Sequence, residues 1–431
     1  MSLSATIYQN EFLPDGASEV NAVVTVAAQD AVAVGPTERA VVIIVDTSGS
    51  MEHPRTKIQA ARRAAAIAME MMPDGTLFAL VAGTDRARCA YPPTGAMVRS
   101  DPGTRAEAVE VARRLPAGGG TAISTWLDLT RQLLLPHTGA IRMAYLLTDG
   151  ANQSEKAADL DAGLARAEGV FQCDTRGVGD AWVVDELRKI ASALLGEVDI
   201  IKEPDQMDDD FRAFLERAGG MTVADVRLRI WTPKGSTLRF VRQVAPSIAD
   251  LTPMAVSVDA LTREFPTGAW AGGESRDYHV CVDVPPADVG GERLAARISL
   301  MEGGAPVSQG LVRAVWTDDE ALSTRIDPQV AHYTGQAELA QAIQEGLQAR
   351  KDGDVDTSTV KLGRAVQLAT AAGNEGTVRL LRKVVDIEDA ASGTVRVKRS
   401  VEALDEMELD TRSTRTVRVH KAAPADEGAA T

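Results

Sequence analysis

The sequence predicts a doubly wound, Rossmann-like α/β domain, followed by an all-β sandwich and a small C-terminal helical bundle. Three observations predict this order. Between residues 37 and 218, short apolar runs alternate with segments of helical period. Between residues 219 and 317, strand-like segments follow one another without helices, and residues 318–392 return to the helical period. Alternating strands and helices are typical of a parallel sheet covered on both faces, whereas successive short strands favour a sandwich.

The first domain begins with a strand predicted at residues 40–45, where AVVIIV is an uninterrupted apolar run. Such runs are typical of strands that are buried on both faces. The helical spacing of Ile58, Ala61 and Ala65 then predicts a helix that ends before Pro73. The same rhythm repeats to residue 218. Further strands are expected at 77–83, 140–148, 170–178 and 197–201, and further helices at 104–114, 122–135, 155–168, 183–194 and 205–218.

Residues 1–36 are expected to supply strands that pair into the sandwich, because Val20, Ala22 and Val24 alternate in strand fashion. In the bundle, Ala340, Ile343 and Leu347 form one apolar stripe at helical spacing. A second stripe consists of Val378, Leu381 and Val385. Residues 393–431 are expected to form a C-terminal strand and a flexible polar tail.

Composition excludes some classes of function. The net charge of −15 disfavours binding to nucleic acid or to an anionic membrane surface. No apolar run approaches the length that spans a bilayer. Cys89, Cys173 and Cys281 lack CxxC spacing and are expected to be free structural thiols. Because the start of the chain lacks the pattern of a signal peptide, we expect a cytoplasmic protein.

A group of oxygen-bearing side chains follows the predicted strands. Asp46, Ser48 and Ser50 come directly after the strand at 40–45, Thr121 precedes a helix in GGGTAIS, and Asp149 ends a strand in LLTDG. Ligands of doubly wound sheets bind at the carboxyl ends of the strands. Mg²⁺ prefers about six oxygen ligands and usually keeps positions open for water or an external ligand. Three hydroxyls and two carboxylates therefore predict a cation site that attracts a further carboxylate.

With its three parts in this order, the sequence resembles the von Willebrand factor type A family over residues 37–218, whose metal-ion-dependent adhesion site begins with DxSxS. The resemblance implies Mg²⁺, or Mn²⁺ or Ca²⁺, as the cofactor. Ser48 and Ser50 would be direct ligands, Thr121 would join in the ligand-bound state, and Asp46 and Asp149 would act directly or through water. It also implies a protein partner with an exposed Asp or Glu. The simpler alternative is a strand-to-helix turn with capping side chains.

The segment 408–419, ELDTRSTRTVRV, places Thr411, Thr414 and Thr416 among arginines in a region expected to be exposed. A Ser/Thr kinase acting there would create a site for a phosphothreonine-binding module. The alternatives are a charged linker or an edge strand docked on the sandwich. The opening QNEFLPDG and this tail also make the chain similar to cytosolic bacterial von Willebrand A proteins encoded with tellurium-resistance-type proteins and Ser/Thr kinase signalling components.

No constellation of catalytic residues is apparent. The sequence contains no GxSxG, no GxxxxGK[ST] and no HExxH motif. We therefore expect a metal-dependent protein-binding scaffold and not an enzyme, in a bacterial stress-response or signalling assembly. The alternative is a von Willebrand A subunit of an AAA+ ATPase-driven remodelling or metal-chelatase-like complex, in which another chain hydrolyses the nucleotide.

Overall fold

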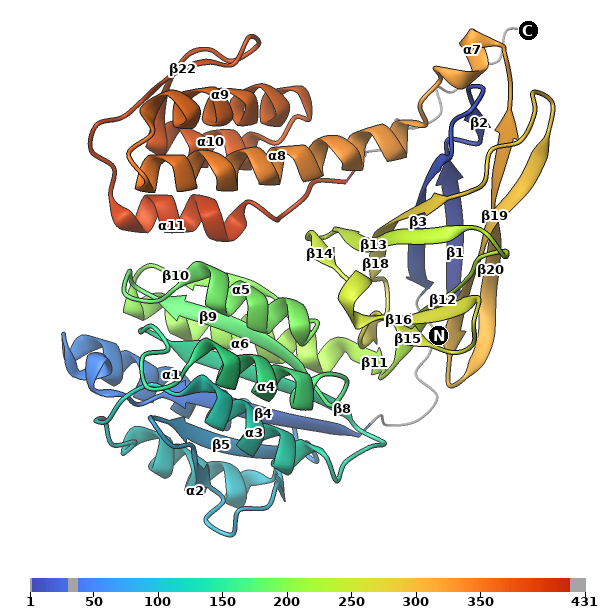
Figure 1. The fold of residues 1–431 in the computed structure, drawn as a ribbon. Coiled ribbons are helices and arrows are strands. Elements are labelled where there is room, and N and C mark those ends of the chain that lie inside the picture. Colours follow the sequence, from blue (N-terminus) through green and yellow to red (C-terminus); the bar gives the residue numbers. More distant parts are fainter. Residues whose placement is uncertain (1, 30–37, 419–431) are drawn as a thin grey trace, which may run out of the picture.

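The computed structural model describes residues 2–29 and 38–418, and Figure 1 shows their arrangement. An α/β domain is followed by a two-sheet β-sandwich and a group of helices, which confirms the predicted fold class. The expected flexible tail lies partly outside the described residues, from 419 to 431. Within the described ranges, no helix is long and apolar enough to cross a membrane. All three cysteines are free, and Cys173 and Cys281 are buried.

The α/β domain is built on a mostly parallel sheet with the order β10-β9-β8-β4-β5-β6. Its parallel strands are β4 (Arg39–Asp46), β5 (Leu77–Gly83), β8 (Ile141–Thr148), β9 (Gln172–Val178) and β10 (Val198–Ile201). The antiparallel edge is formed by β6 (Arg88–Tyr91), and β7 (Val98–Arg99) pairs with β5. The strand order turns back at β4, which has β5 on one side and β8 on the other. This switch point is where doubly wound folds bind ligands.

Helices cover both faces of this sheet. One face packs against α1 (Thr56–Glu70), α2 (Pro102–Arg113) and α6 (Met207–Gly220). The other packs against α3 (Ile123–Leu134), α4 (Ala157–Ala167) and α5 (Val184–Ala193). The buried face of α1 is mainly alanine, including Ala61, Ala64 and Ala68, so this helix approaches the sheet closely. The site at the end of β4 is therefore held on a tightly packed core.

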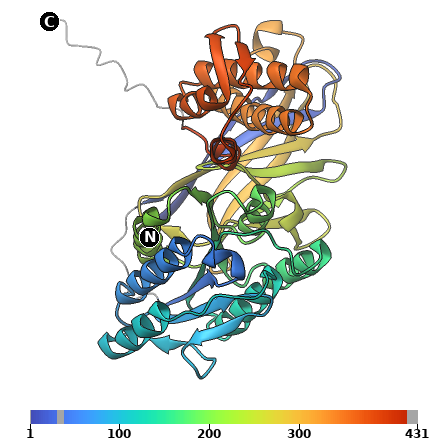
Figure 2. The same cartoon turned by 90° about the vertical axis from the view of Figure 1, so that its left-hand side faces the viewer.

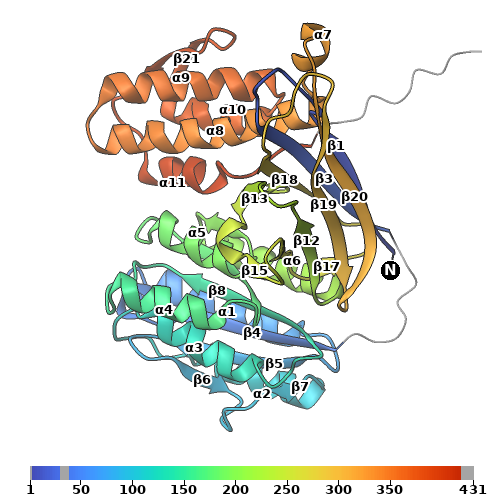
Figure 3. The same cartoon turned by 45° about the vertical axis from the view of Figure 1, so that its right-hand side comes forward.

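The sandwich consists of two sheets, with the orders β1-β3-β18-β13-β14 and β15-β16-β12-β19-β20-β2. Its N-terminal strands are β1 (Ser2–Gln9), β2 (Phe12–Leu13) and β3 (Glu19–Gln29). The others are β12 (Val226–Trp231), β13 (Thr237–Ala245), β14 (Ala249–Asp250), β15 (Val256–Ser257), β16 (Thr262–Pro266), β18 (Ser275–Asp283), β19 (Glu292–Glu302) and β20 (Ala305–Trp316). The N-terminal strand β3 pairs antiparallel with β18. Residues that precede the α/β domain thus complete the sandwich that follows it (Figure 3).

The C-terminal region contains α7 (Glu320–Ser323), α8 (Pro328–Lys351), α9 (Val355–Ala371), α10 (Glu375–Val384) and α11 (Ala403–Arg412). Asp327, Asp354 and Asn374 cap α8, α9 and α10 by accepting hydrogen bonds from backbone amides of the first turn. The expected C-terminal strand is β22 (Thr394–Val397), which pairs antiparallel with β21 (Val385–Asp389). Residues 403–412 form a helix where we expected a strand and tail.

Helix α11 lies between the bundle and the α/β domain (Figures 1 and 2). Leu409 is buried in the core of the bundle, whereas Leu404 and Met407 pack against the α5 side of the α/β domain. The ammonium of Lys202, just after β10, lies 2.8 Å from the Asp405 carboxylate and 2.5 Å from that of Glu408. The acidic residues of α11 are therefore partners for cations of the α/β domain.

Residues 413–418, which we call the C-terminal strap, continue from α11 onto the sandwich. The Ile248 amide donates to the Thr414 carbonyl at 2.8 Å, and the Thr416 amide donates to the Pro246 carbonyl at 3.0 Å. Ser247 and Arg415 form an isolated antiparallel bridge. Of the alternatives for this segment, the structure matches an edge segment docked on the sandwich.

A buried histidine in the sandwich predicts a measurable pH dependence. His279 is 7% exposed and its Nε2 lies 2.8 Å from the Asn21 side-chain oxygen. Burial, together with the nearby Arg242 guanidinium, lowers the pKa of His279 to about 4. The unfolded chain has a histidine pKa of about 6.5, so it takes up the proton first as the pH falls. The stability that neutral His279 contributes above pH 6.5 is therefore lost as the pH falls towards 4.

We expect this residue to lower the free energy of unfolding by about 2 kcal/mol between pH 7.5 and pH 5. The variant His279→Gln keeps a donor for Asn21 and has no proton to take up, so its loss of stability over the same interval should be smaller by that amount. Urea unfolding of both proteins at the two pH values measures the difference. Equal losses in the parent and the variant would contradict the assignment.

Candidate metal-binding site

The site begins at the end of β4, where the chain turns into a short 3-10 helix (Gly49–Glu52) and then into α1. Asp46 is completely buried. Its carboxylate accepts hydrogen bonds from the Ser48 amide, at 2.8 Å, and from the Thr148 hydroxyl, at 2.5 Å. Burial raises the pKa of the Asp46 carboxyl to about 6, against the lowering effect of these hydrogen bonds. The buried Asp46 carboxylate thus connects the turn after β4, through Ser48, to β8, through Thr148.

Two serine hydroxyls and one carboxylate form the centre of the site. The Ser48 and Ser50 hydroxyl oxygens lie 2.9 Å apart, and the Ser50 hydroxyl donates to Asp149 Oδ1 at 2.7 Å. Asp149 directly follows β8, the parallel neighbour of β4, so the two loops meet at the carboxyl edge of the sheet. The structure therefore brings Asp149 into hydrogen-bonding contact with Ser50, which lies 99 residues earlier in the sequence.

A glycine-rich loop places Thr121 beside this centre. The Gly49 amide donates to the Gly119 carbonyl at 3.0 Å. Gly119 has a φ of +86°, a conformation that favours glycine, and a Cβ at Gly120 would lie 1.9 Å from the Ser154 hydroxyl. A Cβ at Gly150 would lie 3.2 Å from the Ser50 hydroxyl and 4.0 Å from that of Thr121. The hydroxyls of Ser50 and Thr121 therefore border the same small space.

The structure adds a residue that sequence reasoning missed. The Lys57 ammonium, in the first turn of α1, donates to Asp149 Oδ2 at 2.8 Å. The Lys57 side chain is 15% exposed and that of Asp149 is completely buried. A cation in the first turn of a helix opposes the helix dipole, which makes Lys57 unusual in the sequence but does not identify Asp149 as its partner.

The donor set fits a hard divalent cation. Ser48, Ser50, Thr121 and Asp149 present only oxygen, which is the ligand type that Mg²⁺ prefers. Within residues 2–29 and 38–418, no three His, Cys, Asp or Glu side chains gather as a possible metal site. A cation at this edge of the sheet would therefore depend on the serine and threonine hydroxyls as much as on carboxylate charge.

The tail threonines lie in a different environment from the one expected. Thr411 is 1% exposed, so the expectation that it is accessible is wrong. Thr414 and Thr416 are half-buried in the strap, and the Thr416 hydroxyl donates to the Val244 carbonyl at 2.7 Å. The reason is that α11 and the strap pack on both neighbouring domains. Modification of Thr414 or Thr416 would require the strap to leave the sandwich, and modification of Thr411 would require α11 to move away from its neighbours.

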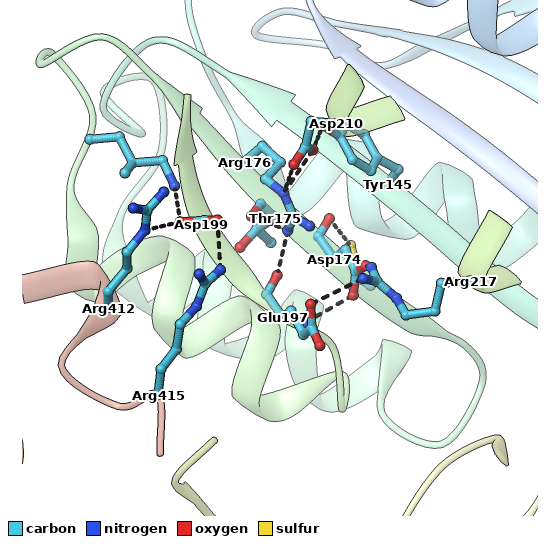
Figure 4. A network of polar contacts seen from close by, with 12 residues as sticks. Tyr145, Asp174, Thr175, Arg176, Glu197, Asp199, Asp210, Arg217, Arg412 and Arg415 are labelled. Carbon is cyan, nitrogen blue, oxygen red and sulfur yellow. Dashed lines mark hydrogen bonds and ion pairs between the residues drawn. The ribbon is translucent and has the colours of Figure 1, made fainter. Parts of the chain in front are cut away.

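Charged side chains connect the end of α11 and the strap to the α/β sheet (Figure 4). Arg412 and Arg415 both contact Asp199 on β10, at 3.1 and 2.6 Å. Burial raises the pKa of Asp199, but the two guanidiniums outweigh it and hold this pKa below its ordinary value. On the neighbouring strand, Arg176 binds Asp210 of α6 at 2.8 Å. Strap, sheet and α6 are therefore joined through ion pairs on one face of the sheet.

Comparison with known proteins agrees with this fold. The family model of the von Willebrand factor type A domain matches residues 41–152, and that of the von Willebrand factor type A C-terminal domain matches residues 367–413. The second match includes α11, which we had assigned to a tail. No curated protein that was compared matches the chain.

Two solved structures resemble the chain over nearly its whole length. The protein described as von Willebrand factor type A from Catenulispora acidiphila is 49% identical, with 97% of each chain covered and a TM-score of 0.91. The ArnB paralog VWA2 from Sulfolobus acidocaldarius is 12% identical, with 96% of this chain and 98% of that chain covered and a TM-score of 0.60. The second likeness shows the fold alone.

Proposed function

We propose that this chain, which belongs to the von Willebrand factor type A family, is a divalent-cation-dependent protein-binding scaffold and not an enzyme. In this proposal Mg²⁺, or Mn²⁺ or Ca²⁺ in its place, is held by Ser48, Ser50 and Asp149. Thr121 joins when a ligand is bound, and Asp46, whose carboxylate accepts hydrogen bonds from the Ser48 amide and the Thr148 hydroxyl, acts directly or through water. An exposed Asp or Glu of a partner protein takes an open position on the ion.

The observation that carries this proposal is the contact chain from Ser48 through Ser50 to Asp149 at the switch point of the sheet. Hydroxyl ligands are neutral, so they leave much of the charge of a divalent ion uncompensated. Such an ion attracts a carboxylate more strongly than a neutral oxygen. Domains of this family generally mediate protein–protein interaction, and this arrangement supplies a physical reason for it.

The setting of the scaffold is also a proposal. We place it in the cytoplasm, in a bacterial stress-response or signalling assembly, on the resemblance of its opening and tail segments. Phosphorylation of Thr411, Thr414 or Thr416 by a Ser/Thr kinase belongs to this proposal only for a chain in which α11 and the strap have detached, because all three threonines are buried or half-buried.

Calorimetry with Mg²⁺ or Mn²⁺ tests the metal site. We expect the parent to bind the ion and to melt at a higher temperature with it, because ligation stabilises only the folded state. The double variant Ser48→Ala with Ser50→Ala should remain folded and lose both effects. Equal affinities in the parent and the double variant would defeat the assignment of the ligands.

Capture of partners from a native lysate tests the function of that site. Partners retained in Mg²⁺ should be released by EDTA and should not be retained by the double variant. For an identified partner, changing the critical Asp or Glu to its amide should weaken binding by about 2–5 kcal/mol, since a charge-assisted contact at an interface is lost. Arg239→Ala, an exposed change on the sandwich, is the matched control. If the partner still binds in EDTA, its binding surface does not depend on the metal site and must lie on another domain.

A further inference from the structure

The contact between Lys57 and Asp149 places an ammonium group at the candidate metal site. Asp149 uses both carboxylate oxygens: Oδ1 accepts from the Ser50 hydroxyl and Oδ2 accepts from the Lys57 ammonium at 2.8 Å. The methylene chain of Lys57 lies beside Gly179, in the loop that follows β9. A Cβ added to Gly179 would be 3.8 Å from Lys57 Cε. The ammonium is thus largely shielded from solvent and is directed at the side of the carboxylate that faces away from the serines.

This ammonium changes the charge of the site. The carboxylates of Asp46 and Asp149 carry two negative charges when ionised, and Lys57 carries one positive charge. With a divalent ion in place, the site retains one net positive charge. A neutral residue at position 57 would leave the loaded site without net charge. The difference matters because Asp46 and Asp149 are completely buried, where charges are screened far less than at the surface.

We infer that Lys57 is a positioning and charge-setting residue, which weakens the affinity of the site for its metal ion and makes the loaded site select an anionic ligand. The inference rests on the proposed function. Lys57 acts through Asp149: it holds the carboxylate with Oδ1 towards the serines and draws charge away from it. A metal bound by this weakened carboxylate attracts the carboxylate of a partner more strongly than it attracts a neutral amide.

Titration of the full chain with Mn²⁺ at low ionic strength tests this inference. Lys57→Gln and Lys57→Met remove the charge, and methionine keeps the stem that packs beside Gly179. We expect both variants to bind Mn²⁺ about tenfold more tightly than the parent, which corresponds to about 1.4 kcal/mol. Lys57→Arg keeps the charge and should bind within about threefold of the parent. These affinities are measured by calorimetry.

The matched control is Arg63→Gln, because Arg63 is 51% exposed on the same helix and its loss changes the net charge by the same amount. It should alter the Mn²⁺ affinity less than about twofold. For a variant too unstable for calorimetry, a larger Mn²⁺-induced rise in melting temperature than that of the parent supports the inference equally.

The outcomes separate the inference from the function on which it rests. Unchanged or weaker Mn²⁺ binding by folded Lys57→Gln and Lys57→Met, with normal binding by the parent, overturns the role of Lys57 and leaves the metal site standing. Absence of Mn²⁺ binding by the folded parent overturns the metal site itself. If Arg63→Gln raised the Mn²⁺ affinity as much as Lys57→Gln, the effect would come from the overall charge of the protein, and the inference would also be overturned.

Discussion

Replacing Arg176 by methionine is expected to lower the free energy of unfolding by about 3–5 kcal/mol, because the change leaves Asp210, whose side chain is only 23% exposed, without its cation. The Arg176 side chain is 5% exposed and binds Asp210 of α6 at 2.8 Å. It also donates to the Glu197 carbonyl at 3.1 Å, and its guanidinium lies 5.5 Å from the centre of the Tyr145 ring. Urea unfolding of the full chain measures the loss.

Two further variants distinguish a lost ion pair from a packing defect. Arg63→Met breaks an exposed pair with Asp208 on the same face of the domain and should change stability by less than about 1 kcal/mol. The double variant Arg176→Met with Asp210→Leu removes both charges, so it should regain part of the loss. A loss below about 1 kcal/mol for Arg176→Met alone would show that the Asp210 carboxylate is solvated or protonated at little cost.

The sheet could be predicted from sequence because its signals are local. The apolar run at 40–45 lies within β4, whose Val42, Ile43 and Ile44 are fully buried. The candidate site could be predicted for a related reason: the parallel strands of one sheet end at the same edge, and Ser50 and Asp149 follow two such strands, β4 and β8. Neither inference required knowledge of contacts that side chains make over long distances.

Helix α11 and Lys57 could not be predicted in this way. The acidic face of α11 resembles a solvated segment in the sequence, but Asp410 pairs with Arg188, 222 residues earlier. Arg412 contacts Asp199, which is 213 residues away. Ion pairs of this kind produce no periodic pattern in the sequence, because the partner of each charged residue lies on a different helix or strand. Lys57 and Asp149 are likewise joined only by the fold.

The same helix is the subject of the second prediction, the replacement of Leu409 by alanine. Leu409 is completely buried in the bundle core, and truncation of such a leucine costs about 2–5 kcal/mol, depending on how far the cavity collapses. We expect this loss in urea unfolding. Leu311→Ala, which truncates a leucine that is 51% exposed on β20, is the matched control and should change stability by less than about 0.5 kcal/mol.

The location of Leu409 predicts more than a lower stability. Helix α11 contacts α8 and α10 on one side and α5 and β10 on the other, so it is shared by the bundle and the α/β domain. Weakening the packing of α11 in the bundle should reduce the coupling between the unfolding of the bundle and that of the α/β domain. Scanning calorimetry of Leu409→Ala should therefore show the bundle melting before the α/β domain, whereas the parent should melt with the two transitions closer together. A single transition, shifted as a whole, would show that the ion pairs to Lys202 and Arg188 suffice to hold the domains together without the leucine.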